Sequence, residues 1–453
     1  MCKKRFASSQ VCNLFLVICL GGACLRAAEW PSWRGPTGDG HAVASNLPVK
    51  WDESSHVLWK TSLPGEGWST PVVQGNAIWL TVARGKKGDA AYEAKRKSLD
   101  TGGQPLDILA SVNLRALCLN RESGVIEKDL DLLTVDSPQW VHKDNTYASP
   151  SPVLEGSQLY CHFGAFGTVC VNLSNDEIAW ANTDLKVMHE NGPGGSPLLY
   201  DGKLFIHCDG SDQQYVAALD AKNGMILWKR ERSGEMHSNP QLKKCYGTPV
   251  IQLVQGRPQL ISQGADWLYG YDPSTGVELW RLDYEHLGFS IVPKPIVDGD
   301  MIYLSTSFMR PHLLAVKNDG QSAPSIRWRV ERSVPSVPSP ILVNDRLYYV
   351  SDQGGLLSCI DIESGKEVYR ERLGGNYYAS PILADGMLLF CSREGKITFV
   401  EPGPEFRVLA ENKLDGAIAA SPVAIGSDLF IRTDGALYRI GHPEIGKQSD
   451  GPL

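Results

Sequence analysis

Ten polar residues stand where a β-rich run begins or where a long loop leads into one. They are Asn145, Tyr147, His189, Glu190, Asp209, Asp212, Gln214, Arg310, Asn376 and Tyr377. Carboxylate, amide, hydroxyl and basic groups that gather in one place can bind a small ligand, so we predict that these ten converge on one binding site. Any one of them, taken singly, is also explained as a turn cap or as a partner for loop backbone.

Metal and catalytic patterns are weak. His189 and Glu190 are both metal-ligand types, but adjacent loop residues without a third ligand do not define a metal site, and we predict none. The sequence has no H-E-x-x-H, G-x-S-x-G or P-loop pattern, and we predict no catalytic residue. Carboxylates and amides are plentiful, so calcium binding stays open on composition.

Seven of the eleven cysteines lie after residue 28, singly and without C-x-x-C spacing. We interpret them as small buried hydrophobic residues rather than a metal cluster. One hypothesis concerns Cys161 and Cys170, which flank a turn at 164–167 and could form a disulfide across a hairpin.

These candidates must be positioned by a repeat of four short β-rich runs, clearest from Ser339 to Leu373. Each copy opens on a proline after a small or polar residue, and the gaps between successive prolines are 81, 45, 52, 46, 45, 41 and 41 residues. The eight prolines are Pro71, Pro152, Pro197, Pro249, Pro295, Pro340, Pro381 and Pro422. Periods of about 40 to 45 residues with four strands are typical of propeller blades, so we predict an all-β, eight-bladed β-propeller of four-stranded antiparallel blades.

A second marker follows the third run of several copies. Gly224, Gly276 and Gly365 each precede an aromatic residue by four positions, and Asp176 stands in the same place before Trp180. Glycine accepts the positive φ of this turn, and we predict that the aromatic side chain covers the seam between two blades.

The pattern Ala-x-Asp-x-x-(Thr/Asn)-Gly-x-x-x-Trp, at Ala218 to Trp228 and nearly so at Gly270 to Trp280, resembles the tryptophan-docking repeat of pyrroloquinoline-quinone (PQQ) type propellers. That superfamily includes the quinoprotein alcohol dehydrogenases and BamB, an accessory lipoprotein of outer-membrane protein assembly. A dehydrogenase of this kind would carry PQQ, calcium and an adjacent cysteine pair, and this sequence has no adjacent cysteines. The resemblance covers nearly the whole chain after residue 28 and is specific for the fold.

The two ends of the repeat complement each other. The eighth copy lacks a fourth run, and His56 to Lys60 is an unassigned run with Trp59 in the marker position. We predict that this N-terminal strand pairs beside Leu437 and Tyr438 and closes the last blade, which removes two exposed sheet edges. Trp30 and Trp33 are expected to pack along the closed ring.

The first 28 residues read as an export signal, with three basic residues before an apolar run too short to span a membrane. The predicted domains are therefore a signal peptide at 1–28, one propeller at 29–442 and a flexible tail at 443–453. Lipid attachment at Cys24 is an alternative to soluble export, because Gly22 and Ala23 precede it, although the leucine that such signals favour comes one position early. No later stretch predicts a transmembrane segment.

The remaining predictions concern partners. A net charge of −7 gives no reason to expect nucleic-acid binding. The long segments, at 84–113, 131–148, 184–195 and 232–247, fall at second-to-third turns and blade-to-blade links, which share one face of a propeller. We call this the long-loop face and the opposite one the tight-turn face.

From the sequence we predict a monomeric, exported, non-enzymatic propeller of the periplasm or cell envelope. It binds an envelope protein or a small ligand through the long-loop face, like BamB. One alternative is a PQQ- and calcium-dependent alcohol or sugar dehydrogenase. The second is a carbohydrate-binding propeller, with Trp140, Tyr377 and Tyr378 as an aromatic platform.

Overall fold

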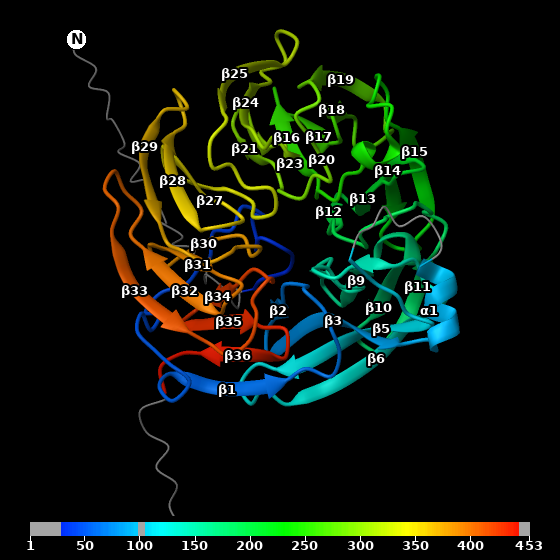
Figure 1. Cartoon of the computed structure of the whole chain (residues 1–453), viewed down its shortest axis with the longest axis vertical. Coiled ribbons are helices and arrows are strands. Elements are labelled where there is room, and N and C mark those ends of the chain that lie inside the picture. The colour runs from blue at the N-terminus through cyan, green and yellow to red at the C-terminus, as the bar shows by residue number, and fades with distance from the viewer. Residues whose placement is uncertain (1–28, 98–104, 444–453) are drawn as a thin grey trace, which may run out of the picture.

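A ring of eight four-stranded antiparallel sheets makes up the molecule (Figure 1). The computed structural model describes residues 29–97 and 105–443 of the chain. The predicted eight-bladed propeller is confirmed. The export signal predicted at 1–28, the attachment site at Cys24 and all but the first residue of the predicted tail lie outside the described residues.

Seven blades each take their four strands from one stretch of chain. Blade 1 consists of β2 (Val72–Gln74), β3 (Ala77–Lys86), β5 (Ser111–Asn120) and β6 (Ile126–Asp136), and blade 2 of β8 (Val153–Glu155), β9 (Gln158–His162), β10 (Thr168–Asn172) and β11 (Glu177–Asn182). Blade 3 consists of β12 (Leu198–Tyr200), β13 (Lys203–Asp209), β14 (Gln214–Asp220) and β15 (Ile226–Glu231). Blade 4 consists of β16 (Val250–Val254), β17 (Arg257–Gln263), β18 (Trp267–Tyr271) and β19 (Glu278–Asp283). Blade 5 consists of β21 (Ile296–Asp298), β22 (Met301–Ser305), β24 (Leu313–Lys317) and β25 (Ser325–Val330). Blade 6 consists of β26 (Ile341–Val343), β27 (Arg346–Val350), β28 (Leu356–Asp361) and β29 (Glu367–Arg372). Blade 7 consists of β30 (Ile382–Ala384), β31 (Met387–Cys391), β32 (Lys396–Val400) and β33 (Val408–Lys413).

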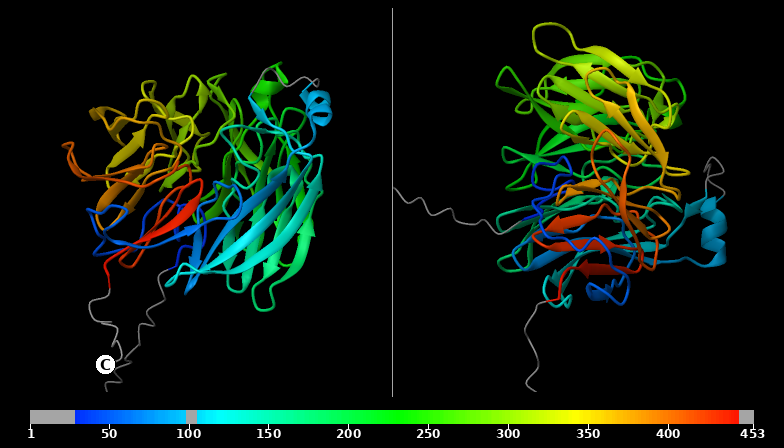
Figure 2. Two further views of the ribbon diagram at one scale, coloured as in Figure 1. Left: turned by 60° about the horizontal axis from the view of Figure 1, so that its bottom comes forward. Right: turned by 90° about the vertical axis from the view of Figure 1, so that its left-hand side faces the viewer.

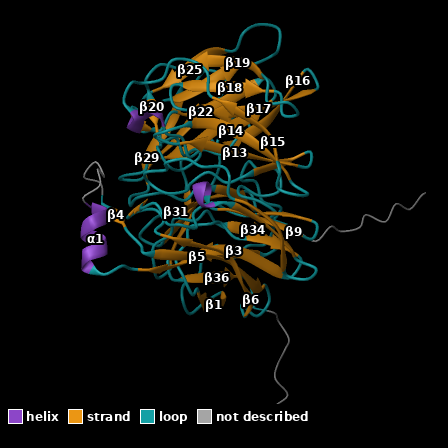
Figure 3. Cartoon of the chain, turned by 90° about the vertical axis from the view of Figure 1, so that its right-hand side faces the viewer, coloured by secondary structure: helices purple, strands orange, loops and turns teal. Residues whose placement is uncertain are grey.

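Smaller elements decorate the links and loops. Two short strand pairs join β4 (Leu106–Asp107) to β7 (Val141–His142) and β20 (Gly288–Phe289) to β23 (Phe308–Met309). The helical elements of the described residues are α1 (Ala90–Lys97) and the 3-10 turns η1 (Gly164–Phe166) and η2 (Pro240–Lys243). Helix α1 and β4 stand out from one face of the ring (Figure 3), and the right-hand view of Figure 2 shows α1 projecting from that face.

The eighth blade is closed by the N-terminal strand. It comprises β34 (Val423–Ile425), β35 (Asp428–Arg432) and β36 (Ala436–Ile440), with β1 (Val57–Ser62) as the fourth strand. Figure 1 shows β1, in blue, beside β36, in red. The predicted closure is confirmed, but Val57 pairs with Ile440 and Lys60 with Tyr438, and a bulge between Val57 and Trp59 shifts the register.

The middle strands of each blade are apolar because both of their faces are covered by neighbouring blades. All of Leu347–Val350 in β27 is buried, whereas the rim strand β29 has mostly exposed or half-buried side chains. One core cluster joins Ile341 and Tyr348 of blade 6 to Leu388 and Phe390 of blade 7. The hydrophobic core therefore lies between the sheets, as blade-on-blade packing requires.

A belt of eight residues, seven with side-chain hydroxyl groups and the eighth Lys294, connects neighbouring blades near the ring axis. Its members are the residues before the eight repeat prolines, and six of the eight junctions have the same hydrogen bond, from the backbone N–H of one member to the hydroxyl of the next. These bonds run from Thr70 to Ser151, Ser151 to Ser196, Ser196 to Thr248, Lys294 to Ser339, Ser339 to Ser380 and Ser380 to Ser421, at 2.9 to 3.1 Å. The following proline has no N–H of its own to satisfy. The prolines that mark the repeat thus also mark its inter-blade bonds.

Residues 30–47, the axial segment, cross the ring axis and bond to inner strands. Trp30 pairs with Val73 of blade 1, His41 with Leu383 of blade 7, and Ala44 with Gly426 of blade 8. Arg34 is buried and donates hydrogen bonds to the carbonyl oxygens of Pro340 and Pro381. The axial segment therefore satisfies inner-strand edges that would otherwise be unpaired.

Indole rings bridge several rim strands to the next blade, as the marker spacing predicts. The Nε1–H groups of Trp59, Trp180, Trp228 and Trp328 donate to backbone carbonyls of the neighbouring blade at 2.9 to 3.2 Å. Trp280 differs, because its Nε1–H donates to Gln259 of its own blade.

Two predicted long segments are shorter than expected. Arg84 to Lys86 and Ser111 to Asn113 extend β3 and β5, where they pair with each other, so the insert of blade 1 starts after Lys86. Asp131 to Asp136 likewise belong to β6. The ends of β3, β5 and β6 carry many polar residues, and for this reason they are predicted as loops from the sequence.

The hypothesis of a disulfide between Cys161 and Cys170 is wrong, because both are free. Cys161 lies opposite Val169, and Cys170 lies opposite Tyr160. Adjacent register positions point to opposite faces of a sheet, and the two thiols accordingly lie in different core clusters.

Replacing Gly224 tests the inter-blade indole contacts. A Cβ atom at Gly224 would lie 2.4 Å from Cε3 of Trp180, whereas one at Gly202 meets nothing within 4 Å, and φ is positive at both. Each alanine substitution costs about 1–2 kcal/mol of unfolding free energy for the left-handed backbone. We expect Gly224→Ala to lose about 1–3 kcal/mol more than Gly202→Ala in urea denaturation, because the indole must move. Equal losses would show that the contact does not matter.

Replacing Ser339 tests the hydroxyl belt. Ser339→Ala removes the acceptor of the buried Lys294 N–H, which lies 3.0 Å away. We expect a loss of about 1–3 kcal/mol with an unchanged denaturant slope, because a buried donor is left unpaired. Ser322→Ala, at an exposed position, is the control and should change little. A loss no larger than that of the control would contradict a stabilising belt.

Candidate functional site

A cavity of about 730 Å³ lies where the blade-to-blade links meet above the belt. Its lining comes from the links and the axial segment, together with Phe308 from a second-to-third turn. The lining residues are Trp33, Trp68, Thr70, Trp140, His142, Asp144, Asn145, Ser149, Ser151, Glu190, Asn191, Gly194, Ser196, Gln241, Leu242, Lys244, Tyr246, Thr248, Phe289, Ser290, Val292, Phe308, Val337, Tyr378, Ser380, Ala419 and Ser421. This volume lies within the range of about 300–1,000 Å³ typical of small-molecule sites.

The cavity floor consists of belt hydroxyls and one indole. Six belt members line it, and Trp33 of the axial segment donates its Nε1–H to the hydroxyl of Ser421 at 3.4 Å. Trp33 was expected to pack along the ring. It is half-buried and forms part of the cavity, whereas Trp30 is a core residue.

Aromatic side chains form much of the wall. Phe289 and Phe308 belong to the paired strands β20 and β23, and their rings lie 6.4 Å apart. The guanidinium of Arg96 on α1 stacks over Trp140, 5.5 Å from its ring, so the insert of blade 1 supports this wall from behind. Such amphipathic and aromatic surfaces can contact both apolar and hydrogen-bonding parts of a ligand.

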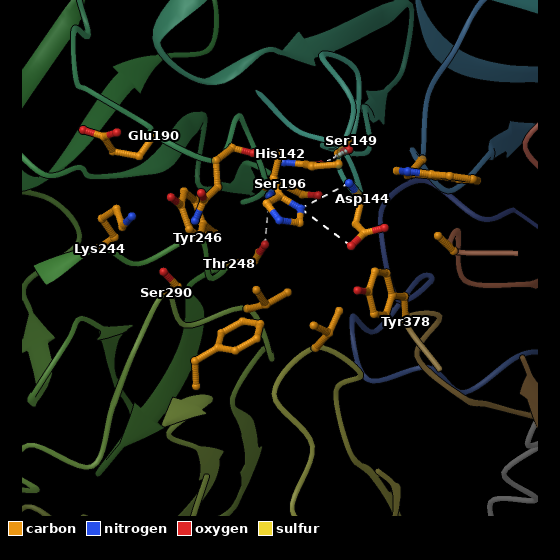
Figure 4. A pocket seen from close by; sticks show the side chains of 18 of the residues that line it. His142, Asp144, Ser149, Glu190, Ser196, Lys244, Tyr246, Thr248, Ser290 and Tyr378 are labelled. Carbon is orange, nitrogen blue, oxygen red and sulfur yellow. Dashed lines mark hydrogen bonds and ion pairs between the residues drawn. The ribbon is translucent and has the colours of Figure 1, made fainter. Parts of the chain in front are cut away.

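One side of the cavity carries Glu190, Lys244 and Tyr246 (Figure 4). The Oγ–H of Ser211 donates to Glu190 at 2.7 Å, and the ammonium of Lys244 donates to Gln241 at 2.7 Å. Burial lowers the pKa of Lys244, and the nearby carboxylate of Glu190 partly opposes this shift. Lys244, the lysine that the described residues contribute to the lining, is thus already engaged by the protein.

The opposite side carries Asp144 and Tyr378 (Figure 4). The Asp144 carboxylate lies 3.7 Å from both His142 Nδ1 and Arg393 Nη1, and the Arg393 guanidinium stacks 4.3 Å over the Tyr378 ring. Burial lowers the pKa of His142, although Asp144 favours its charged form. His142 is therefore mainly neutral at pH 7, and Asp144 presents acceptor oxygens to the cavity.

Of the ten residues predicted to form the site, Asn145 and Glu190 line the cavity. Asn145 also holds the first link in shape, since its Nδ2–H₂ donates to the carbonyls of Asn191 and Pro193 at 2.8 and 3.0 Å. The other eight do not line the cavity, so the structure does not bring the ten together.

Four of those eight are buried in structural contacts. Tyr147 packs 5.6 Å from the Phe166 ring, and Tyr377 belongs to the core between blades 6 and 7. His189 accepts the Ala165 N–H at 2.6 Å, and burial lowers its pKa to about 4 against the opposing charge of Asp212. Asp209, the fourth, is ion-paired with Arg232 at 2.7 Å, with both side chains buried.

The remaining four are less buried and serve local structure. Asp212 accepts the Met188 N–H at 2.7 Å, Gln214 donates to the Gly210 carbonyl at 2.8 Å, and Asn376 donates to Glu394 at 2.8 Å. Arg310 is exposed, and its backbone N–H donates to Leu287 at 3.2 Å. Of the proposed aromatic platform, Trp140 and Tyr378 line the cavity and Tyr377 does not.

Sequence reasoning missed most of the wall and the whole floor. A signal for the floor was present, because every floor hydroxyl immediately precedes a repeat proline. Trp68, Tyr246 and Tyr378 each stand three residues before a repeat proline, so one repeat position contributes three aromatic residues to the wall. Phe289 and Phe308 carry no comparable signal.

His207, Asp209 and Cys245 form one group of possible metal ligands, with ligand atoms within 4.8 Å of one another. The group does not line the cavity, and both carboxylate oxygens of Asp209 accept from Arg232, at 2.9 and 2.7 Å. Burial alone lowers the pKa of Arg232, but the Asp209 carboxylate outweighs it and raises the pKa above its ordinary value. A guanidinium already occupies the place where a cation would bind.

The eight four-stranded blades and the indole contacts between them define an eight-bladed β-propeller of the PQQ type. The sequence model of a family described as outer membrane protein assembly factor BamB matches residues 128–281, 212–348 and 324–436. The chain belongs to this family.

Individual relatives are distant. BamB of Yersinia pestis is 22% identical over 363 residues, which cover 74% of this chain and 88% of the relative. BamB of Shewanella oneidensis is 26% identical over 179 residues, 38% of this chain, and BamB of Escherichia coli K12 is 26% identical over 191 residues, 42% of this chain. The matches to these last two span only 41% and 45% of their lengths.

Solved structures share the fold at low sequence identity. BamB from Moraxella catarrhalis aligns with a TM-score of 0.55 and 11% identity, covering 86% of this chain and 98% of that one. A europium-containing methanol dehydrogenase aligns with a TM-score of 0.62 and 10% identity, covering 92% and 98%. A BamB protein and a methanol dehydrogenase are thus both similar to this chain in fold, so function has to be argued from the site. In the described part of the chain, none of the helices could cross a bilayer.

Asp209 allows a structural role to be separated from ligand binding. Asp209→Asn removes the charge that compensates the buried Arg232, and we expect a loss of about 3–5 kcal/mol of unfolding free energy. The control Asp212→Asn, nearby and exposed, keeps an oxygen acceptor and should lose less than about 1 kcal/mol. Chemical denaturation of both variants measures this, and similar small losses would contradict a structural ion pair.

Proposed function

We propose that this chain is an exported, non-enzymatic propeller of the cell envelope that binds an envelope protein or a small ligand through its long-loop face. The observation that carries the proposal is the chemistry of the cavity lining. It contains aromatic rings and hydroxyl groups from the converging links, and among the described residues none of these hydroxyl groups is hydrogen-bonded to the ring of His142, which accepts the Asp144 N–H instead. The relatives in its family are named as outer membrane protein assembly factors, which supports an envelope role.

A PQQ-dependent dehydrogenase is the main alternative, and the cavity lining does not favour it. PQQ carries three carboxylate groups, which proteins ordinarily bind with arginine or lysine. Among the described residues, the cavity lining has one cationic side chain, Lys244, against Asp144 and Glu190, and it has no arginine. The one three-ligand metal group found in the described residues lies elsewhere. These donors therefore do not fit PQQ with calcium, and we derive no redox step through them.

The converging links and the aromatic wall support the choice of face. Phe308 is 41% exposed at the edge of the cavity, whereas Val125 is 59% exposed at a third-to-fourth strand turn on the tight-turn side. A partner that binds the long-loop face would contact the first position and not the second.

Site-specific photo-crosslinking from these two positions tests the proposal. We expect a benzoylphenylalanine at position 308 to form a discrete crosslinked product in cells of the source organism, and one at position 125 to form none. Fractionation of the same cells should place the full chain in the envelope. A crosslink from position 125 alone, or a cytoplasmic chain, would overturn the proposal.

The enzymatic alternative is tested on purified protein. Incubation with PQQ and Ca²⁺, followed by gel filtration, should leave no quinone absorbance on the chain and no dye-linked oxidation of alcohols or sugars. Retention of one PQQ per chain together with dye reduction would instead establish the dehydrogenase.

A further inference from the structure

The belt hydroxyls that line the cavity have hydrogen atoms to donate. Thr70, Ser151, Ser196, Thr248, Ser380 and Ser421 all line the floor. The last five each accept a hydrogen bond from a backbone N–H. None of the six hydroxyls has an acceptor for its own O–H among the described residues. The floor is therefore a ring of hydrogen-bond donors that the protein leaves free for a ligand.

A further buried hydroxyl in the wall has no partner. Ser290 lines the cavity, is 4% exposed, and its Oγ has no hydrogen bond to the described protein. Its position is fixed, because its backbone N–H donates to the carbonyl of Lys244. A buried hydroxyl without a partner is costly, and this Oγ has almost no accessible surface, so a ligand in the cavity would complete it once the Ser290 side chain rotates towards it.

The wall offers aromatic faces near these hydroxyls. Trp68 and Tyr378 are half-buried and line the cavity. The Nε1–H of Trp68 has no hydrogen-bond acceptor in the described protein and is not enclosed. The site therefore combines stacking surfaces with donors, and Asp144 and Glu190 add acceptors.

Charge separates the ligand classes that could use this arrangement. A multiply charged anion would meet two carboxylates and one lysine already bound to Gln241. An organic cation would suit the carboxylates and rings but would leave the hydroxyl donors of the floor unpaired. A sugar suits the aromatic rings, the hydroxyl donors and the carboxylate acceptors together, because its C–H face stacks on aromatic rings and its hydroxyl groups both donate and accept hydrogen bonds.

We infer that the cavity binds an uncharged saccharide, with Trp68 and Tyr378 as stacking residues and the belt hydroxyls and Ser290 as partners of the sugar oxygens. This inference rests on the proposed binding role of the long-loop face. It specifies the ligand class of that face.

Calorimetric titration of the purified full chain tests the inference. The probes are cellotetraose, chitotetraose, maltotetraose and xylotetraose, with glycerol and tetragalacturonate as controls. We expect at least one neutral tetrasaccharide to bind with one-to-one stoichiometry. Trp68→Ala and Tyr378→Ala should each weaken this binding by about tenfold or more, because each removes a stacking face.

A matched control is Trp267→Ala, a half-buried tryptophan outside the cavity, which should leave the affinity unchanged. Tyr378→Phe keeps the ring and should retain most of the affinity. Circular dichroism and thermal midpoints must show that each variant is folded.

Three results would overturn the inference: no binding by any neutral probe, binding insensitive to both cavity variants, or binding of tetragalacturonate alone. None of them bears on the crosslinking and fractionation experiments, so the saccharide inference can fail while the envelope role stands.

Discussion

The whole ring depends on how backbone N–H groups near its axis find acceptors. Inner strands converge there and have no further strand on the axial side, so their polar backbone would be buried and unpaired. A hydroxyl followed by proline solves this at six junctions, because the hydroxyl accepts the neighbour's N–H and the proline has none. The residue before a proline also prefers extended backbone, which suits the entry to a strand. The same dipeptide thus sets the spacing of blades and supplies the cavity floor.

Blade 5 has a lysine, Lys294, where the other blades have a hydroxyl residue before the repeat proline. Lys294 occupies the belt position and cannot accept a hydrogen bond, and its ammonium donates to the Gly38 carbonyl of the axial segment at 2.8 Å. Burial lowers its pKa to about 8, with Arg34 adding to the shift and Asp39 opposing it. Its folded pKa lies below the unfolded value, so an ammonium at this site destabilises the folded chain at neutral pH and does so less as the pH rises past 8. At blade 5 the axial segment is therefore bonded directly to the belt, through Lys294 and Gly38.

The fold could be predicted from the sequence because its signals repeat. Eight prolines, the Asp-Gly-aromatic turns and the unassigned run ending in Lys60 each follow from local rules that apply in every blade. The site was harder, because a polar residue at a strand entry is equally suited to binding a ligand and to holding a link in shape. His189 and Asp209 illustrate this, since His189 Nε2 accepts from the Ala165 N–H and the Asp209 carboxylate is paired with Arg232. The pairing of Phe289 with Phe308 depends on two loops meeting, which no local pattern records.

The closure of the last blade by β1 has a consequence for the nascent chain. The axial segment and β1 are synthesised well before their partners Leu383, Gly426 and Ile440. Until then the early strand is an unpaired edge that must be kept from other edges. The contact between Trp33 and Ser421 forms only when the ring is complete. An incompletely translated chain would lack that contact, so the cavity floor is assembled only when both ends of the ring are present.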